Sequence, residues 1–553
     1  MKRLYFLLLV ISVALSYTLN AQGKFIRKDS ISVPAEQTGG WANFVAGLDL
    51  DKDGKPEIYV VNNDVNDLGA ELIPKIYKYE LTNGKWTLVW STTLDTPLQN
   101  SWAGLTAGDI DNDGNTEIIW TPANQLNTTT NPNPDRIVVF RPQASGDGMG
   151  VEFLGGASLP NAKTKITTEA NRDMRPFQLM VTDVDGDGKN ELLYADRQAM
   201  TATGGGLSFA IISVDKVPLS GDGSEKWTIK ASGKDASMTQ MTLSSKYDVV
   251  VLNGIIYLFD SNGYVIPVKK VNSVWTALAP QKSVAGTTGS YKSAQVVDIN
   301  GDGKKEIVFG GWSDGLVYLA QQQGDTLVAN QIGNFKKLGI ARLNGGANGD
   351  IDGDGKVDFV FGSRPPSGTP PQGYLYNAVC RVSYKGGAIA DSNSYACTII
   401  DSLIDKNLGQ PDVISIVDLD GDKKPEVVYT SGYPRGPSSY NPQIPIVILK
   451  YQAPSSVEKE NSAAPSSYYM IQNYPNPFNP STAIKFGLQN DANVSLRIFN
   501  ILGQQVATII DNQQMNAGTY NVKFDASSLS SGTYIYQLNY NNQIITKKMQ
   551  LMK

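Results

Sequence analysis

Short apolar runs rich in β-branched and aromatic residues recur along the chain, and each directly follows a group of acidic residues. The runs occupy residues 58–61, 118–120, 192–194, 307–309, 359–361 and 427–429. Runs of this length and composition are typical of buried β-strands, and segments with helical spacing are few. The pattern predicts an all-β chain in which each acidic group lies in a loop between two strands.

The acidic groups share one nine-residue pattern, with oxygen-bearing side chains at positions 1, 3, 5 and 9. Crowded carboxylates repel one another unless a cation lies among them, and several hard oxygen ligands favour Ca²⁺ over Mg²⁺ and transition metals. We therefore predict six calcium loops, although Lys423 replaces the turn glycine in the last one and leaves calcium binding open there. The predicted ligands are Asp49, Asp51, Asp53 and Glu57; Asp109, Asp111, Asp113 and Glu117; Asp183, Asp185, Asp187 and Glu191; Asp298, Asn300, Asp302 and Glu306; Asp350, Asp352, Asp354 and Asp358; and Asp418, Asp420, Asp422 and Glu426.

An EF-hand loop opens in the same way, but it needs a bidentate Glu at position 12 and a helix on each side. Position 12 here is filled by Val60, Trp120, Tyr194, Phe309, Phe361 and Tyr429. These apolar residues exclude the EF-hand. A solvated acidic turn would explain one such loop, but not six with the same internal spacing.

The interval between the loops that begin at Asp183 and Asp298 is about twice the others, which indicates a repeat without a metal loop. Residues 238–243 and 248–252 are expected as strands there. Asn253-Gly254 and Asn262-Gly263 are hairpin-turn dipeptides that lead into strands at 255–259 and 264–268. The chain is therefore predicted to hold seven units and six calcium sites.

Each unit is predicted to carry four strands, which in the second unit are residues 102–107, 117–120, 136–140 and 151–154. Radial repetition of four-stranded sheets is the β-propeller. The last unit is one strand short, whereas residues 24–33 form a strand with no preceding partner. We predict a seven-bladed β-propeller over residues 22–451, whose seventh blade is completed by the N-terminal strand 24–33 so that no edge stays exposed.

The N-terminal segment, residues 1–21, has Lys2 and Arg3, then an apolar run, then a polar stretch that ends at Ala21. This is the pattern of a secretory signal peptide, and the apolar run is too short to span a bilayer. No later stretch approaches about twenty apolar residues. We expect no membrane span in the mature chain.

The amino-acid composition excludes several binding partners and several kinds of catalytic site. The net charge is −5, and no Lys/Arg cluster indicates nucleic acid or an anionic membrane. Histidine is absent, which excludes Ser-His-Asp and Cys-His catalysis and His-ligated zinc, and no catalytic residue or cofactor motif is recognisable. The two cysteines, Cys380 and Cys397, are predicted to form a disulfide across a hairpin with its turn near residues 385–387. Two unpaired buried thiols are the alternative.

The repeated loops resemble the FG-GAP/VCBS repeat family, the calcium-loop propellers that include the integrin α-chain head, over roughly residues 24–451. Five of the loops end in Glu, where the family often has Asp. The resemblance implies that calcium is structural, that the loops lie on one face of the propeller, and that ligands meet the opposite face.

That opposite face is expected to carry the irregular segments 62–75, 121–136, 195–208, 362–374 and 430–445. Aromatic residues that precede the loops by six to eight positions are expected to ring the mouth of the axial channel: Trp41, Trp102, Phe177 and Tyr291. Candidates for stacking on sugar rings or gripping a protein are Trp312, Arg364, Tyr433, Arg435 and Tyr440. For each of these aromatics, packing between blades is the competing interpretation.

Residues 452–467 form a polar, unpatterned segment that predicts a linker. Strands are then expected at 483–488, 493–500, 504–510, 518–525, 532–540 and 543–551, with the spacing of a small Ig-like β-sandwich.

This C-terminal domain, residues 468–553, closely resembles the type A sorting domain of the type IX secretion system. The motifs that carry the resemblance lie at 473–481, 499–504, 517–518, 531–534 and 547–553. It implies export by the Sec route, recognition by the type IX machinery at the outer membrane, and a location on the surface of a Gram-negative bacterium or outside it.

These features predict a secreted or cell-surface calcium-binding propeller that binds a glycan or a protein, in adhesion or scavenging. Two alternatives stay open. One is a polysaccharide-degrading enzyme of the lyase kind, which would need a base and a charge neutraliser from Tyr, Lys or Arg in the central pocket. The other is a purely structural surface protein. The sequence does not identify the ligand.

Overall fold

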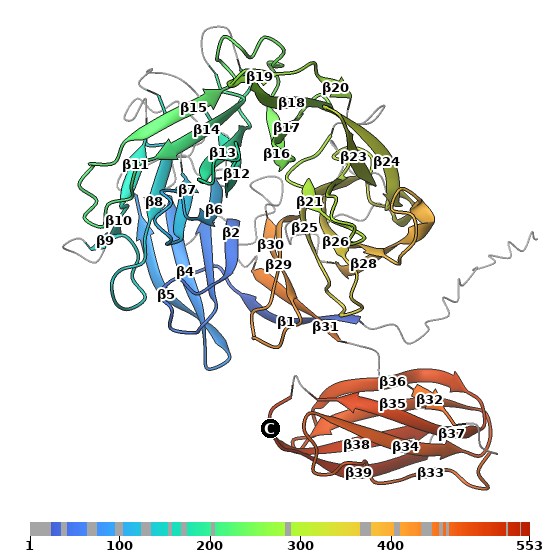
Figure 1. Ribbon diagram of the computed structural model, residues 1–553. Coiled ribbons are helices and arrows are strands. Elements are labelled where there is room, and N and C mark those ends of the chain that lie inside the picture. Colours follow the sequence, from blue (N-terminus) through green and yellow to red (C-terminus); the bar gives the residue numbers. More distant parts are fainter. Residues whose placement is uncertain are drawn as a thin grey trace, which may run out of the picture. The chain divides into compact units, whose positions relative to one another are not determined.

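The computed structural model describes residues 24–34, 41–62, 74–94, 103–122, 134–152, 158–167, 174–200, 205–282, 289–364, 378–402, 410–432, 445–452, 457–460, 464–526, 529–541 and 543–553. These form two compact units, one of Phe25–Lys450 and one that contains Tyr451–Lys553 (Figure 1). Apart from the short 3₁₀ helices η1 (Lys336–Leu338) and η2 (Ser392–Ser394), the regular structure of the described residues is entirely β-strand. This confirms the predicted all-β class. In the same residues, no helix is long and apolar enough to cross a membrane.

The first three sheets of the larger unit are antiparallel and have the strand orders β2-β3-β4-β5, β6-β7-β8-β11 and β12-β13-β14-β15. A small hairpin of β9 and β10 accompanies the second sheet in sequence. The strands are β2 (Trp41–Leu48), β3 (Glu57–Asn62), β4 (Lys75–Thr82), β5 (Lys85–Thr93), β6 (Gly104–Gly108), β7 (Glu117–Thr121), β8 (Ile137–Phe140), β9 (Val151–Glu152), β10 (Ser158–Leu159), β11 (Ala162–Thr164), β12 (Pro176–Thr182), β13 (Glu191–Asp196), β14 (Phe209–Val214) and β15 (Trp227–Ser232).

The remaining sheets of this unit have the orders β16-β17-β18-β19 with β20 beside β18, β21-β22-β23-β24, β25-β26-β27-β28 and β29-β30-β31-β1. In the last of these sheets, the N-terminal strand β1 lies beside β31, which is the last strand of the unit in sequence. The strands are β1 (Lys24–Ile31), β16 (Lys246–Leu252), β17 (Ile255–Asp260), β18 (Tyr264–Val271), β19 (Val274–Ala277), β20 (Gln281–Lys282), β21 (Gln295–Val297), β22 (Glu306–Gly310), β23 (Leu316–Gln323), β24 (Thr326–Asn334), β25 (Arg342–Gly349), β26 (Asp358–Arg364), β27 (Ala378–Tyr384), β28 (Tyr395–Ser402), β29 (Gln410–Val417), β30 (Glu426–Gly432) and β31 (Ile446–Gln452).

The second strand of each sheet is buried on both faces, because successive residues face different neighbouring sheets. In β3, Ile58 packs into a cluster with Val428 of β30, whereas Tyr59 packs into a cluster with Ile118 of β7. Each of the seven hydrophobic clusters of this unit joins one sheet to the next in the same way. Burial on both faces explains why these strands are uninterrupted apolar runs in the sequence.

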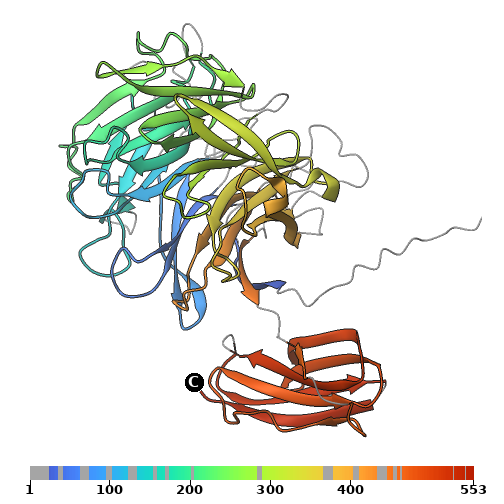
Figure 2. The same cartoon turned by 45° about the vertical axis from the view of Figure 1, so that its right-hand side comes forward.

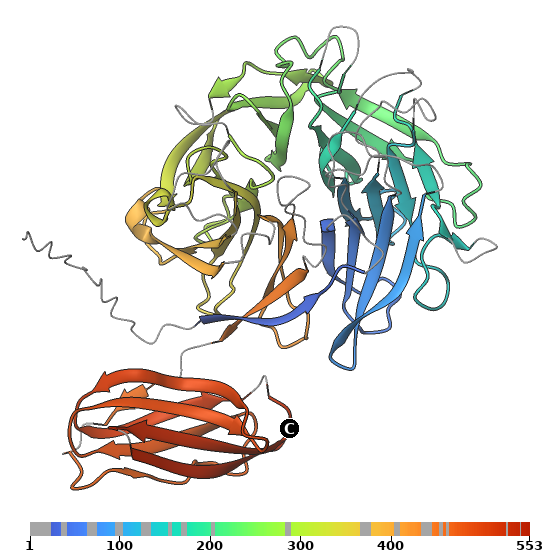
Figure 3. The ribbon, with the colours of Figure 1, turned by 180° about the vertical axis from the view of Figure 1, so that it is seen from behind.

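The first strands of the sheets lie nearest the centre of the unit (Figures 1 and 3). Each contacts the first strand of the next sheet, from β2 through β6, β12, β16, β21 and β25 to β29, and β29 contacts β2. The chain colours follow the same circuit when the unit is turned (Figure 2). The sheets therefore form a closed ring around an axis.

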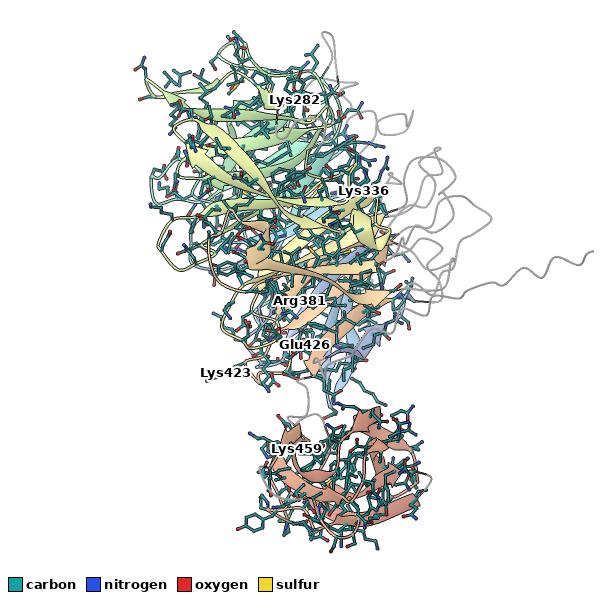
Figure 4. All side chains as sticks on the ribbon, turned by 90° about the vertical axis from the view of Figure 1, so that its right-hand side faces the viewer. Lys282, Lys336, Arg381, Lys423, Glu426 and Lys459 are labelled. Carbon is teal, nitrogen blue, oxygen red and sulfur yellow. The ribbon has the colours of Figure 1, made fainter. Side chains whose placement is uncertain are left out.

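The acidic loops lie at one end of the inner strands, and the segments that enter these strands lie at the other end. Each acidic loop follows the C-terminal end of its first strand, whereas η1 precedes the N-terminal end of β25. Figure 4 views the unit from the side and shows Lys423, in the last acidic loop, at one edge and Lys336 of η1 at the other. We call these the loop end and the mouth end.

Two strands differ from the sequence prediction. Residues 238–243 are turns and irregular backbone, and the burial of Met238 and Met241 explains why their sequence resembles a strand. The first strand of that sheet is β16, joined to β17 by Asn253 and Gly254, which both have positive φ. In the second sheet the outer strand is β11, which pairs with β8. Val151, at the start of the predicted outer strand 151–154, pairs with Leu159 in the β9–β10 hairpin instead.

The smaller unit has two four-stranded sheets with the orders β32-β37-β34-β33 and β36-β35-β38-β39. Ile484 and Val522 of one sheet and Val494 and Leu538 of the other share a single fully buried core. All six strands predicted here are present. The bounds are β32 (Val457–Lys459), β33 (Tyr469–Met470), β34 (Ser481–Leu488), β35 (Ala492–Asn500), β36 (Gln505–Met515), β37 (Gly518–Asp525), β38 (Gly532–Tyr540) and β39 (Gln543–Leu551).

One strand of this unit, β32, lies inside the segment 452–467 that the sequence predicted as a linker. It pairs with β37, and the Glu460 N–H donates to the Thr519 carbonyl at 2.9 Å. The segment is therefore partly a strand that covers an edge. Three residues are too few to show a strand period, which is why the sequence pattern missed it.

Candidate metal loops and axial pocket

All six acidic loops share a set of internal hydrogen bonds. The position-1 carboxylate accepts the N–H of position 6 at 2.8–3.1 Å. The position-5 carboxylate accepts the N–H of position 7 at 2.9 Å in each loop. The acids at positions 1 and 5 therefore shape the loop as well as supply oxygens that could meet a metal.

The acid at position 9 is the first residue of the second strand and is buried in every loop, with at most 3% of its surface exposed. One of its oxygens accepts the N–H of position 2, at distances from 2.9 Å in the Asp418 loop to 3.5 Å in the Asp298 loop. Asp358 makes the same bond with a shorter side chain, at 3.2 Å. Burial raises the pKa of Glu117 to about 7, although the Ile110 N–H and Arg141 both act to lower it.

Each loop also needs two residues with left-handed backbone. Position 6 has φ between +79° and +90° at the five glycines and +67° at Lys423. Position 4 has positive φ as well, including +62° at Lys52 and +63° at Asn112. The sequence identified position 6 but not position 4, because residues other than glycine occupy position 4 in two loops.

Among the described residues, at least three loops place carboxylate oxygens within 4.8 Å of one another: Asp49 with Asp51 and Asp53; Asp109 with Asp111 and Glu117; and Asp183 with Asp185 and Glu191. Groups of this kind can hold a metal ion. Three of the four predicted ligands of each of these loops therefore lie close together, and metal binding by them stays a prediction.

A basic side chain from a neighbouring strand reaches into the Asp49 loop. Lys78 of β4 has no exposed surface, and its Nζ lies 2.6 Å from Asp51, 2.9 Å from Glu57 and 3.0 Å from Glu80. Burial alone would lower the pKa of Lys78, but hydrogen bonds to these carboxylates raise it above its ordinary value. Lys78 is therefore a charged ammonium inside the acidic cluster.

Four other loops have an equivalent cation, and in each it pairs with the aspartate at position 3. The pairs are Arg141 with Asp111, Lys270 with Asp185, Arg381 with Asp352, and both Lys28 and Lys450 with Asp420. Hydrogen bonds from Lys28 and Lys450 outweigh burial and hold the pKa of Asp420 below its usual range.

The Asp298 loop differs. Its position 3 is Asn300, whose Nδ2 donates to Asp302 at 3.2 Å, and no lysine or arginine among the described residues forms an ion pair with this loop. The residue opposite Glu306 is Gln321, where the Asp109 loop has Arg141 opposite Glu117. Among the residues that the structure describes, a position-3 aspartate is accompanied by a cation and the position-3 asparagine is not.

The loop pattern does not indicate these cations, because they come from other strands. A signal does exist: Lys78 stands among the apolar and aromatic residues of β4, and Arg381 among those of β27. A basic residue within a buried strand needs a partner, and the nearby acidic loop supplies it.

At the mouth end, the inner strands enclose a cavity of about 130 Å³. Its lining comes from β2, β6, β12, β25 and β29 and from the residues just before β21. The polar lining residues are Asn43, Gln178, Lys292 and Asp412. An adjoining small cavity shares Asn43, Lys292 and Asp412 and reaches Trp41 and Tyr291.

The aromatic residues predicted to ring this mouth do gather there, but they are packed. Trp41, Phe177 and Tyr291 are 1%, 2% and 3% exposed. Tyr291 stacks on Trp312 at 4.1 Å and meets Phe177 edge-on at 5.2 Å. Their main role is therefore packing, in agreement with the competing interpretation. Trp102 lies outside the described residues.

Arg364 is also held within the protein. It donates two hydrogen bonds to Asp412, at 2.9 and 2.8 Å, and lies over the rings of Tyr291 and Trp312. Tyr433, Arg435 and Tyr440 lie outside the described residues, as do most of the irregular segments predicted for this face.

The cysteines do not form the predicted disulfide. Both are free, and the strand register places Cys380 opposite Ile399 and Cys397 opposite Val382. They are thus diagonal neighbours, for which Cα atoms typically lie about 7–8 Å apart, beyond the usual disulfide range. Burial raises the pKa of both thiols, which disfavours thiolate chemistry.

Two segments match known protein families. Residues 49–120 match the FG-GAP-like repeat, so the class of repeat that contains the first two loops is established. Residues 472–552 match the secretion system C-terminal sorting domain. The chain is therefore exported by the type IX secretion system to the cell surface or the extracellular space, and its C-terminal unit interacts with that machinery.

No protein of curated function matches the chain. Solved structures with partial similarity include α-L-arabinofuranosidase from Lactobacillus brevis, with 12% identity over 51% of this chain and 90% of that one, and a TM-score of 0.30. Another is an S. cerevisiae complex of Dbp5 bound to Nup159, Gle1, IP6 and ADP, with 10% identity over 64% of this chain and 89% of that one, and a TM-score of 0.27. Similarity at this level carries no argument about function.

Proposed function

We propose that the larger unit is a seven-bladed β-propeller of the FG-GAP kind and that the smaller unit is an Ig-like β-sandwich. The ring of sheets, the hydrophobic clusters between them, and the pairing of β1 with β31 support the first assignment. The two sheets that share one core support the second.

The acidic loops are proposed to hold Ca²⁺ in a structural role. Convergent carboxylates at positions 1, 3 and 5, as in the Asp49 loop, are the hard oxygen donors that Ca²⁺ takes. The Asp298 loop is expected to depend most on the metal, because its carboxylates have no side-chain cation among the described residues. In the other five loops the cation already neutralises part of the charge when no metal is bound.

The protein is proposed to act outside the cell as a binding module, with its ligand site at the mouth end. The observation that carries this proposal is the axial cavity, where several sheets each contribute a different side chain. The loop end instead repeats one arrangement six times, as a structural support would. A role in adhesion or scavenging would follow from a glycan or protein ligand.

The test is a screen of the purified mature chain against glycans and extracellular proteins, with calcium and with EDTA. Binding without product formation supports the binding module. Absence of binding in all conditions would contradict the binding module and favour a purely structural surface protein.

The enzymatic alternative has one supporting observation. Burial lowers the pKa of Lys292 to about 7, which is the range that a general base requires. Release of unsaturated oligosaccharides from an acidic polysaccharide would favour a lyase over a binding module.

Export can be tested on the same chain. Deletion of residues 472–552 removes the matched sorting domain, so the truncated protein should accumulate in the periplasm while the full chain reaches the surface or the medium. Cell fractionation distinguishes the two results.

A further inference from the structure

Lys292 occupies an unusual position at the mouth end. It follows Tyr291 directly, lies deep in the ring, and still exposes part of its surface to the axial cavity. Its backbone φ is +52°, in the left-handed region that residues with a side chain rarely adopt. Such backbone strain persists only where the surrounding structure enforces it, and it is concentrated at functional sites.

The enforcing group is Asp248 of β16, in the sheet that lacks an acidic loop. This fully buried carboxylate accepts hydrogen bonds from Ser290 Oγ at 2.5 Å, the Ser293 N–H at 2.6 Å and the Ala294 N–H at 2.8 Å. Asp248 therefore fixes both sides of the turn that presents Lys292 to the cavity.

The Lys292 ammonium is incompletely satisfied. An ammonium has three N–H donors, and the described residues offer it one hydrogen-bond acceptor, Asn43 Oδ1 at 2.9 Å, and the ring of Phe177 at 4.0 Å. Lys246, which is also buried, donates instead to the Thr242 carbonyl, the Thr242 hydroxyl and the Ser244 carbonyl. Lys246 is thus a satisfied structural lysine, whereas Lys292 keeps donors that face the cavity.

Lys292 also has no counterion among the described residues. The one carboxylate that lines the cavity, Asp412, is neutralised by two hydrogen bonds from Arg364 and accepts another from Asn344 at 2.5 Å. Asn43 is held in place because its Nδ2 donates to the Ala103 carbonyl. When it is protonated, Lys292 is therefore a cation that no described carboxylate contacts directly, and it keeps N–H donors for the cavity.

We propose that the axial cavity binds a single carboxylate group, with Lys292 as its counterion. One unpaired cation matches a monoanion, because a phosphate or sulfate dianion would leave an unpaired negative charge in a buried site. The carboxylate can come from a uronic acid residue of a polysaccharide or from a small free acid. This inference rests on the proposed binding function and specifies its ligand class.

Binding by Lys292 should depend on pH. Burial lowers its pKa to about 7, against attraction to Asp412 and Asp248, with Arg197 and Arg364 also lowering it. A bound carboxylate favours the charged ammonium, so above about pH 7 the site must take up a proton when the ligand binds. The affinity should fall as the pH rises from 7 to 9, up to tenfold per pH unit.

The experiment uses isothermal titration of the full mature chain with galacturonate, oligogalacturonate, acetate and neutral galactose. Galacturonate should bind and galactose should not. Binding of acetate as well as galacturonate identifies a site for small free acids, whereas binding of oligogalacturonate and galacturonate without acetate identifies a sugar site. Binding of galactose as tight as galacturonate would overturn the proposal.

The variant Lys292→Met should lose at least tenfold in affinity, and Lys292→Arg should retain part of it. The matched control is Lys336→Met, since Lys336 is an exposed lysine at the same end of the ring. Equal galacturonate binding by folded Lys292→Met protein would overturn the proposal.

If Lys292→Met does not fold, titration of the native protein at pH 8 in buffers of different ionisation enthalpy provides the second test. Proton uptake on galacturonate binding supports the site, and its absence contradicts it. Polysaccharide binding that survives Lys292→Met would contradict this inference and leave the proposed function intact, whereas absence of all binding would contradict both.

Discussion

The Asp49 and Asp298 loops share the backbone hydrogen bonds to positions 1, 5 and 9 but balance their charge differently. In the Asp49 loop, Lys78 places an ammonium among the carboxylates. In the Asp298 loop, an asparagine at position 3 removes one charge, and no side-chain cation is paired with the rest among the described residues. Loop shape is thus encoded by the repeat, whereas charge balance is set by the surrounding sheet.

This difference separates two roles of the acidic residues, folding of the loop and pairing with a cation, which the sequence pattern alone does not distinguish. Positions 1, 5 and 9 accept backbone N–H groups and are needed to fold the loop with or without a metal. Position 3 accepts the cation wherever it is an aspartate. A Ca²⁺ ion at such a loop would share its carboxylates with a lysine or arginine.

The largest effect is expected from Lys78→Met. Removing the ammonium leaves buried Glu57 without its cation and Glu80 with Lys55 alone, and breaking a buried pair from one side costs about 3 to 5 kcal/mol. Urea denaturation in EDTA should show this loss, and added Ca²⁺ should recover part of it. Lys85→Met, at an exposed position on the next strand, is the control and should change little. Unchanged stability of the Lys78 variant would show that the Asp49 loop does not need this cation.

Calcium removal should give the next largest effect. With a Kd of ~10⁻³ to 10⁻⁴ M, ~10 mM free Ca²⁺ stabilises an occupied site by roughly 1.4 to 2.7 kcal/mol. Asp298→Ala should remove more of the calcium-dependent rise in Tm than Asp49→Ala does. Asp298 accepts the N–H groups of positions 4, 5 and 6, whereas Asp49 accepts that of position 6. The two variants are therefore compared by the calcium-dependent part of Tm, which excludes the loss of loop hydrogen bonds in EDTA. Equal losses, or a larger loss for Asp49→Ala, would show that Lys78 does not substitute for the ion.

A smaller effect is expected from Asn300→Asp. The added carboxylate should destabilise the chain by about 0.5 to 1 kcal/mol in EDTA and strengthen calcium binding. Adding Gln321→Arg places a cation opposite Glu306, as Arg141 lies opposite Glu117. The double variant should recover stability in EDTA. A double-mutant cycle measures this coupling, and zero coupling would contradict the link between position 3 and the cation.

The smallest effect is expected from Lys423→Gly. Lys423 has φ +67°, and a left-handed residue with a Cβ costs about 1 kcal/mol, part of which the greater freedom of glycine in the unfolded chain offsets. The variant should gain about 0.5 kcal/mol, measured by thermal unfolding. Gly54→Ala, at the same position of the first loop, should instead lower the stability, because Gly54 has φ +84°. The added Cβ meets no neighbouring atom, so the backbone strain alone is measured.

Local pattern was sufficient for the second strands and the loops, because both depend on residues close in sequence. Ile58 and Tyr59 belong to a run that is apolar because two sheets cover it, and the run alone indicates burial. The cations were not predictable in this way, since Lys28 reaches Asp420 from the other end of the unit.

The axial pocket was beyond sequence analysis for a related reason. Lys292, Asp412 and Asn43 come from different sheets and meet only when the ring closes. Met238 and Met241 illustrate a different error, because they are buried outside any strand and their apolar sequence resembles one. Sequence pattern reports burial more reliably than it reports contacts between distant segments.

The place of β1 beside β31 sets an order of events during biogenesis. Ribosomes make Lys24–Ile31 first, yet its partner Ile446–Gln452 is made only after every other sheet of the ring. Closing so long a stretch of chain is entropically costly and slow. Until then β31 has an open edge that can recruit other strands, so the nascent protein is most exposed to aggregation and proteolysis just before its last sheet is completed.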